Sequence, residues 1–291
     1  MRHAILVCAH TNFKILQMFI DLFDDEKYDF YILVDKKVPV DEKTVLERYP
    51  KKSSVYFCPR IDVCWAGYSL IEANLLLYEE SSKRNYDYYH FFHGSDFPLK
   101  TCNEVDGFFT KNLGKQFVNI HQTAFTKTKC GYYHFFVDNR YYRNNYFVKA
   151  MNKICLYAQK LIKVKRNCDI ELYCGSAMTS LTHDCVMYVL SKRDEIKKRF
   201  NYALAADEVF LQTMIANSPF RDQIYKFDNS YHANVRLIDW GRRAGNSPYT
   251  FKMNDFEQLI SVDEDICFAR KFDEKIDFEV VLKLYEHLSN K

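Results

Sequence analysis

The chain has 291 residues, 48% of them hydrophobic, which suits one large α/β domain or two small ones with a sizeable core. Only 8 glycines and 6 prolines argue against long linkers and intrinsic disorder. A formal net charge of +3 is too small to indicate nucleic-acid binding, and no RRM, zinc-finger or helix-turn-helix pattern is present.

The N-terminal stretch "MRHAILVCAHTN" is apolar only from Ala4 to Ala9, which is shorter than the apolar core of a secretory signal. No apolar run approaches the roughly 20 residues of a membrane span. We therefore expect a cytoplasmic protein in a reducing compartment, with its ten cysteines as free thiols. Neither a CxxC motif nor a Cys/His metal spacing occurs, so no zinc site is expected.

The first part of the chain predicts a parallel sheet covered by helices. Short, continuously apolar runs are typical of strands that are buried on both faces, and four such runs occur, at 4–10, 29–35, 54–58 and 86–94. Apolar residues at helical spacing predict helices over 12–24 and 69–81. Strands that alternate with helices in this way indicate an α/β fold with mainly parallel strands.

The second half is less regular. Residues 145–166 have helical spacing and a basic face, and 174–190 predict a turn, a strand and a helix capped by Thr182 or His183. Residues 204–215 predict a helix with two acids, Asp207 and Glu208, in its first turn. Acids at this position are favourable against the helix dipole, so they have a structural explanation beside a functional one.

Four polar residues stand at or just after the predicted strand ends, namely His10, Asp35, Arg60 and Asp96. In parallel sheets ligands bind beyond the carboxyl ends of the strands, so the four residues suggest a nucleotide cleft. The segment "CAHTNF" after the first strand has no glycine, which disfavours a Rossmann or P-loop site. The stretch "HGSDFPLKT" around Asp96 also fits an ordinary turn.

Several segments then occur in a characteristic order along nearly the whole chain. They are "LVDKK" (33–37), "RIDVCWAGYSLIEA" (60–73), "HGSDFPLKT" (93–101), "YYHF" (132–135), "GSAMTSLT" (175–182), "ADEVFLQTMI" (206–215), "LIDW…GNSPYTF" (237–251) and "FARKFD" (268–273). Together they resemble the core-2/I-branching β-1,6-N-acetylglucosaminyltransferase family, which also includes peptide O-xylosyltransferases. "DFPLKT" and "FARKF" are the most specific pieces.

The resemblance implies a single GT-A-like domain, with a nucleotide-sugar half over 1–125 and an acceptor-binding and catalytic half over 126–291. It also implies an inverting mechanism, a UDP-sugar donor and no metal cofactor. The residues agree, because Asp35 stands alone before two lysines and makes a poor divalent-cation site. Arg270 and Lys271 match the family positions that neutralise the diphosphate, although a solvated surface pair is the structural alternative.

The family's motifs also assign roles to single residues. Glu208 falls on the position of the general base, which takes the proton of the attacking hydroxyl. Trp65 matches an aromatic residue near the donor sugar, with a place in the core as the alternative. The predicted UDP-sugar-binding residues are Ala9, His10, Asp35, Arg60, Trp65, Asp96, Arg270 and Lys271. The predicted acceptor-binding residues are Tyr133, Met178, Asp207, Asp239 and Trp240.

The chain also departs from the family. Many relatives have an aromatic residue after "GS", where this chain has Ala177 and Met178, and Tyr132 replaces an acid of the core-2 branch. We therefore expect a different acceptor and a stand-alone, bacterial-type enzyme of surface polysaccharide biosynthesis. N-acetylglucosamine is the expected donor sugar. The alternatives are a UDP-xylose or UDP-glucuronate donor, a metal-dependent enzyme with its second ligand at Asp96, and a catalytically silent sugar-nucleotide or glycan-binding protein.

The segment 145–166 suggests how the enzyme reaches an acceptor carried on a membrane lipid. Its apolar positions are Phe147, Val148, Met151, Ile154, Cys155, Ala158, Leu161 and Ile162. Its basic positions are Lys149, Lys153, Lys160, Lys163, Lys165 and Arg166. Such a helix can lie at an anionic membrane surface, which predicts peripheral contact with the inner face of the membrane. A helix packed on the domain is the alternative.

Overall fold

The computed structural model describes residues 1–41, 44–227, 232–243, 245 and 247–291. Its central sheet has the strand order β3-β2-β1-β4-β6. The first four strands are parallel, and β6 runs antiparallel to β4. The strands are β1 (His3–Ala9), β2 (Tyr28–Val34), β3 (Ser54–Phe57), β4 (Tyr88–His93) and β6 (Ser180–Thr182). The predicted α/β class with a mainly parallel sheet is therefore confirmed.

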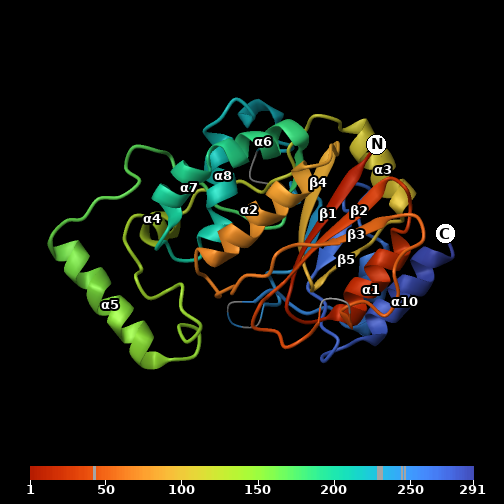
Figure 1. Cartoon of the computed structure of the whole chain (residues 1–291), viewed down its shortest axis with the longest axis horizontal. Coiled ribbons are helices and arrows are strands. Elements are labelled where there is room, and N and C mark those ends of the chain that lie inside the picture. Colours follow the sequence, from red (N-terminus) through yellow and green to blue (C-terminus); the bar gives the residue numbers. More distant parts are fainter. Residues whose placement is uncertain (42–43, 228–231, 244, 246) are drawn as a thin grey trace.

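Helices cover both faces of this sheet (Figure 1). Alternate residues of β1 point to opposite faces, so that Leu6 joins one apolar cluster and Val7 the other. The first cluster lies against α2 (Ser69–Ser82), α6 (His183–Ser191) and α8 (Phe210–Ala216). The second lies against α1 (Phe13–Leu22) and α10 (Glu279–Ser289). Burial on both faces explains why the strands are continuously apolar.

A smaller sheet brings the end of the chain back to its first half. β5 (Asp96–Pro98) pairs antiparallel with β8 (Phe268–Arg270), and β8 pairs in parallel with β7 (Arg236–Ile238). The register places Asp96 opposite Arg270. Residues from both predicted halves thus meet in one site, and the functional division at residue 125 stays a prediction.

The helix predicted over 204–215 is interrupted, which corrects that expectation. Ala206–Glu208 form a 3₁₀ turn (η2), and α8 begins only at Phe210. The Glu208 carbonyl accepts a hydrogen bond from Gly175 N at 2.9 Å, and Val209 departs from helical geometry with φ −129°. Asp207 and Glu208 therefore lie in a separate turn before α8 and not in its first turn.

The remaining helices follow the surface, and α5 lies at the edge of the molecule, away from the sheet (Figure 1). No helix in the described ranges is long and apolar enough to cross a membrane. The remaining helices are α3 (Cys102–Lys111), α4 (Ala124–Cys130), α5 (Tyr146–Leu161), α7 (Arg193–Phe200) and α9 (Phe256–Ile260), with the 3₁₀ turns η3 (Arg221–Gln223) and η4 (Met253–Asp255).

Candidate active site

Three loops meet beyond the carboxyl end of β1. Asn12, in the loop after β1, donates from Nδ2 to Ser95 Oγ at 3.0 Å, and Phe272 N donates to Ser95 O at 2.9 Å. A Cβ atom on Gly94 would lie 2.7 Å from the Thr11 carbonyl oxygen, so the "HGSD" turn needs glycine for this close approach. The hydrogen bonds fix the segments that carry His10, Asp96 and Lys271 at one edge.

Asp96 and Arg270 form a buried ion pair at this edge. Asp96 Oδ1 accepts from Arg270 Nη1 at 2.8 Å, and Oδ2 accepts from His93 N at 2.7 Å. Asp96 is the first residue of β5, just after the turn that follows β4. The Arg270 side chain is 19% exposed, so it is not a freely solvated surface residue. Burial and then the Arg270 charge lower the pKa of His93 to about 4, which keeps its imidazole neutral.

Asp35 follows β2 and is already paired with a cation. Lys37 Nζ donates to both Asp35 carboxylate oxygens, at 3.0 and 2.8 Å, and Val63 N lies 3.4 Å from Oδ1. Asp35 N donates to Ala9 O at 2.9 Å, which places Ala9 and Asp35 side by side. In this arrangement the Lys37 ammonium group neutralises the Asp35 carboxylate. Within the described residues, no group of three or more His, Cys, Asp or Glu side chains is arranged to hold a metal.

Arg60 lies near this edge, but its donors are used inside the protein. Its guanidinium donates to backbone carbonyls at the end of β2 and in the segment that follows it, namely Val34 O at 3.2 Å, Asp35 O at 3.0 Å and Val40 O at 2.8 Å. It therefore shapes the loop that presents Asp35. Direct contact of Arg60 with a nucleotide stays a prediction.

Three cations and one carboxylate act on His10. Partial loss of hydration lowers the pKa of His10 from its ordinary value, and Lys37, Arg143 and Lys271 lower it further, while Asp35 opposes them. Burial, and then the Arg270 and Arg143 charges, lower the pKa of Lys271. Such a concentration of positive charge suits a diphosphate.

Arg143 was missed by the sequence reasoning. It belongs to the segment between α4 and α5, and its guanidinium carbon lies 5.7 Å from the centre of the Trp65 ring. The Trp65 side chain is 46% exposed, so the alternative of a core tryptophan is wrong. Trp65 and Arg143 therefore lie together at the surface, beside the cations around His10.

The loop that carries Trp65 is fixed by its glycine and by the segment before η2. A Cβ on Gly67 would lie 2.2 Å from Asp138 Oδ1, and the Asp138 carboxylate accepts from Ser69 Oγ at 2.7 Å. Ala205 N donates to Ala66 O at 2.8 Å. This hydrogen bond joins the Trp65 loop to the turn that holds Glu208.

Glu208 is half-exposed and paired with a lysine that the sequence reasoning also missed. Lys129 Nζ on α4 donates to Glu208 Oε2 at 2.8 Å, and the Lys129 side chain is largely buried. Burial first, and Glu208 second, raise the pKa of Asp207 to about 7, against the pull of Lys129. Gly175 supports the turn, because a Cβ there would lie 2.1 Å from Asn119 O.

The predicted acceptor residues lie on several elements. Met178 is buried, and its carbonyl accepts from Asn234 Nδ2 at 3.1 Å. Asp239 and Trp240 follow β7, and Asp239 is engaged by Arg242 Nε at 2.6 Å, whereas Trp240 is exposed. Tyr133 stacks on the exposed Phe135 with ring centroids 5.6 Å apart.

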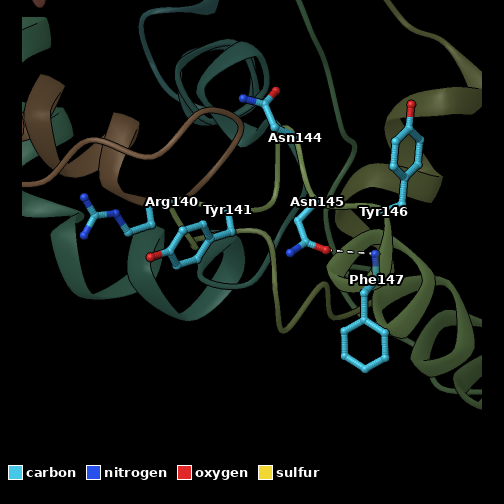
Figure 2. A pocket seen from close by; sticks show the side chains of 6 residues that line it. All are labelled: Arg140, Tyr141, Asn144, Asn145, Tyr146 and Phe147. Atoms are coloured by element: carbon cyan, nitrogen blue, oxygen red, sulfur yellow. Dashed lines mark hydrogen bonds between the residues drawn. The ribbon is translucent and has the colours of Figure 1, made fainter.

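Tyr133 also bonds to α5 through its backbone, since Tyr133 N donates to Gln159 Oε1 at 2.8 Å. The acceptor roles of all five predicted residues stay predictions. A hollow of about 530 Å³ beside the start of α5 contains none of the predicted site residues (Figure 2).

The mainly parallel sheet, with these charged groups beyond its carboxyl edge, is the arrangement of a GT-A-like fold. The model of the core-2/I-branching enzyme family matches residues 4–260, and the chain belongs to that family.

The curated relatives include two kinds of xylosyltransferase. Xylosyltransferase 2 of Rattus norvegicus is 26% identical over 284 residues, which cover 90% of this chain and 31% of that protein. Xylosyltransferase 1 of Homo sapiens is 23% identical over 306 residues, covering 98% of this chain and 30% of that protein. The chain thus spans less than a third of the length of these relatives.

Proposed function

We propose that the protein transfers a sugar from a UDP-sugar to a hydroxyl of a glycan acceptor, with inversion at the anomeric carbon and without a metal ion. The observation that carries the proposal is the 2.8 Å hydrogen bond from Ala205 N to Ala66 O. It connects the loop of Trp65, at the donor edge, with the turn of Glu208. A carboxylate beside a donor site can take the proton of an attacking hydroxyl.

Glu208 is the general base of the proposal. Its side chain is exposed enough to contact an acceptor, and its ion pair with Lys129 holds the carboxylate in one orientation. A positioned base of this kind typically contributes about 10²–10⁴-fold to the rate. Asp207, whose raised pKa of about 7 keeps a sizeable fraction of neutral acid near neutral pH, is suited to donate a hydrogen bond to the acceptor in that form.

The leaving diphosphate is neutralised by side chains. Arg270, Lys271 and Arg143 are the proposed partners, because the Arg270 and Arg143 charges act on Lys271, and the Arg143 and Lys271 charges act on His10, at the carboxyl edge of the sheet. Each charge-assisted hydrogen bond to phosphate is worth about 1.5–3 kcal/mol. Three such contacts are enough to replace a divalent cation.

N-acetylglucosamine is the donor sugar that the resemblance to the core-2 branch supports. UDP-xylose is the second candidate, because the chain matches curated xylosyltransferases over 90% or more of its length. UDP-glucuronate remains an alternative donor. The proposed acceptor is a glycan of surface polysaccharide biosynthesis, carried on a membrane lipid and reached from the cytoplasm.

The test is a UDP-release screen with UDP-N-acetylglucosamine, UDP-xylose, UDP-glucuronate, UDP-galactose and UDP-glucose, with and without EDTA. We expect one donor to be turned over in EDTA by the wild type and at least about a hundredfold more slowly by Glu208→Gln. Binding of a UDP-sugar without any turnover would instead favour the silent binding protein. A loss of activity in EDTA that Mn²⁺ restores would favour the metal-dependent alternative with Asp96 as a ligand.

A further inference from the structure

Helix α5 turns polar side chains toward the body of the protein and apolar ones toward solvent. Its two buried residues are Asn152 and Gln159. Asn152 Nδ2 lies 3.0 Å from His134 Nδ1, and Gln159 Nε2 donates to Tyr133 O at 2.8 Å. The helix is therefore attached by these hydrogen bonds and by half-buried apolar side chains such as Val148, which packs on a small apolar cluster, while its largest apolar side chains face solvent.

The exposed face of α5 is a continuous apolar stripe. At 100° per residue, the stripe lies opposite Asn152 and Gln159. Tyr146, Phe147 and Leu161 are the most exposed, at 87%, 72% and 82%. We call this surface the α5 stripe, and its large members are Tyr146, Phe147, Ile154, Tyr157 and Leu161.

The expected apolar face is thereby divided. Val148, Met151 and Cys155 are half-buried on the body side, whereas the α5 stripe gains two tyrosines that the sequence reasoning did not assign to it. Tyrosines are enriched where protein meets the membrane–water interface, because the ring is apolar and the hydroxyl is polar.

The charged side chains in the chain segment that carries the α5 stripe are all positive. Residues 139–168 contain eight Lys and Arg and no Asp or Glu, while the whole chain has a net charge of only +3. The rest of the chain is therefore net negative. Lys153 and Lys160 lie along one side of the stripe at helical spacing, and Lys160 Nζ is 5.7 Å from the centre of the Tyr157 ring. Lysines beside aromatic residues can extend toward anionic headgroups.

We propose that the α5 stripe docks on an anionic lipid bilayer. A helix with exposed aromatic and aliphatic side chains and flanking lysines matches an interfacial membrane helix in both apolar area and charge. A second copy of the chain fits less well, because a symmetric contact through this face would bring Lys153 and Lys160 of the two copies together.

The hollow beside the start of α5 extends the same surface. It is lined by Arg140, Tyr141, Asn144, Asn145, Tyr146 and Phe147. Figure 2 shows the Tyr146 and Phe147 rings pointing away from each other, with Asn145 Oδ1 accepting from Phe147 N at 2.9 Å. The first turn of α5 is thus fixed by its cap while its rings stay free to meet lipid.

Vesicle co-sedimentation of the full chain tests the proposal without donor or acceptor, so its failure is distinct from failure of the proposed transferase activity. We expect binding to phosphatidylcholine vesicles containing phosphatidylglycerol, and much weaker binding to pure phosphatidylcholine or at high salt. The double variant Ile154→Ser/Leu161→Ser should lose binding to both kinds of vesicle. Leu113→Ser/Ile276→Ser, which removes exposed apolar residues elsewhere, should bind like the wild type.

A second pair of variants isolates the charge. Lys153→Gln/Lys160→Gln should weaken binding to anionic vesicles by about 30-fold, because each basic residue near such a surface contributes about 1 kcal/mol. The control Lys51→Gln/Lys52→Gln, also exposed, should leave binding unchanged. The proposal is overturned if wild-type protein does not bind anionic vesicles, if the α5 variants bind as tightly as their controls, or if the stripe instead mediates dimerisation in sedimentation analysis.

Discussion

Asp207 should make the protein less stable as the pH rises toward neutrality. Burial and the neighbouring Glu208 raise its pKa from 3.8 to about 7. Between these values the folded state holds a proton that the unfolded chain has released, so the free energy of unfolding falls from about pH 4 to about pH 7. A shift of about three pH units corresponds to about 4 kcal/mol at most. Because the Asp207 residue is only partly buried, we expect about 1–3 kcal/mol.

Urea unfolding between about pH 5 and about pH 8 measures this effect. Asp207→Asn cannot ionise, so its stability relative to the wild type should increase across this range. Glu208→Gln is the matched control, because it keeps Asp207 but removes the second cause of the raised pKa, and its stability should fall less steeply than that of the wild type. A constant difference between the wild type and Asp207→Asn across the range would refute the reasoning.

Three further predictions concern the proposed site. Glu208→Gln should keep UDP affinity in calorimetry but reduce steady-state transfer at least about a hundredfold, and near-normal turnover would place the base elsewhere. Arg270→Ala should weaken UDP binding and also lower the free energy of unfolding by about 3 kcal/mol, since it leaves a buried carboxylate unpaired, whereas Lys271→Ala should weaken UDP binding alone. Unchanged UDP affinity in both would contradict the metal-replacement argument. Gly175→Ala should lower both stability and transfer, because its Cβ meets a backbone carbonyl at 2.1 Å. Gly107→Ala, with open space around its Cβ, should leave transfer unchanged in the same assays.

The sequence predicted the buried strands because their signal is local. β1 and β2 lie within one residue of the predicted runs, since a strand covered on both faces must be apolar at every position. The residues that follow these strands could be placed at one edge for the same reason. The pattern does not contain the direction in which each side chain points. It therefore could not show that Arg60 donates to backbone carbonyls inside the protein.

Contacts between residues that are far apart in the chain leave no local pattern in the sequence. Arg143 and Lys129 approach the site because the chain from α4 to α5 follows a path fixed by close packing, such as that of Asp138 on Gly67. Helical spacing found α5 but could not tell which side faces the body. The hydrogen bonds of Asn152 and Gln159 decide that orientation, and they depend on partners outside the helix.

The pairing of β5 with β8 also bears on how the chain is made. Asp96 and Arg270 are 174 positions apart, so their strand pairing must close a very long loop. Contacts of this separation form slowly, and here they cannot form before most of the chain has been synthesised. Until then β5 has an open edge, which can pair with strands of other chains. A polypeptide interrupted before β8 should therefore aggregate during synthesis. Productive folding depends on keeping the edge of β5 from pairing with other chains until β8 has been synthesised.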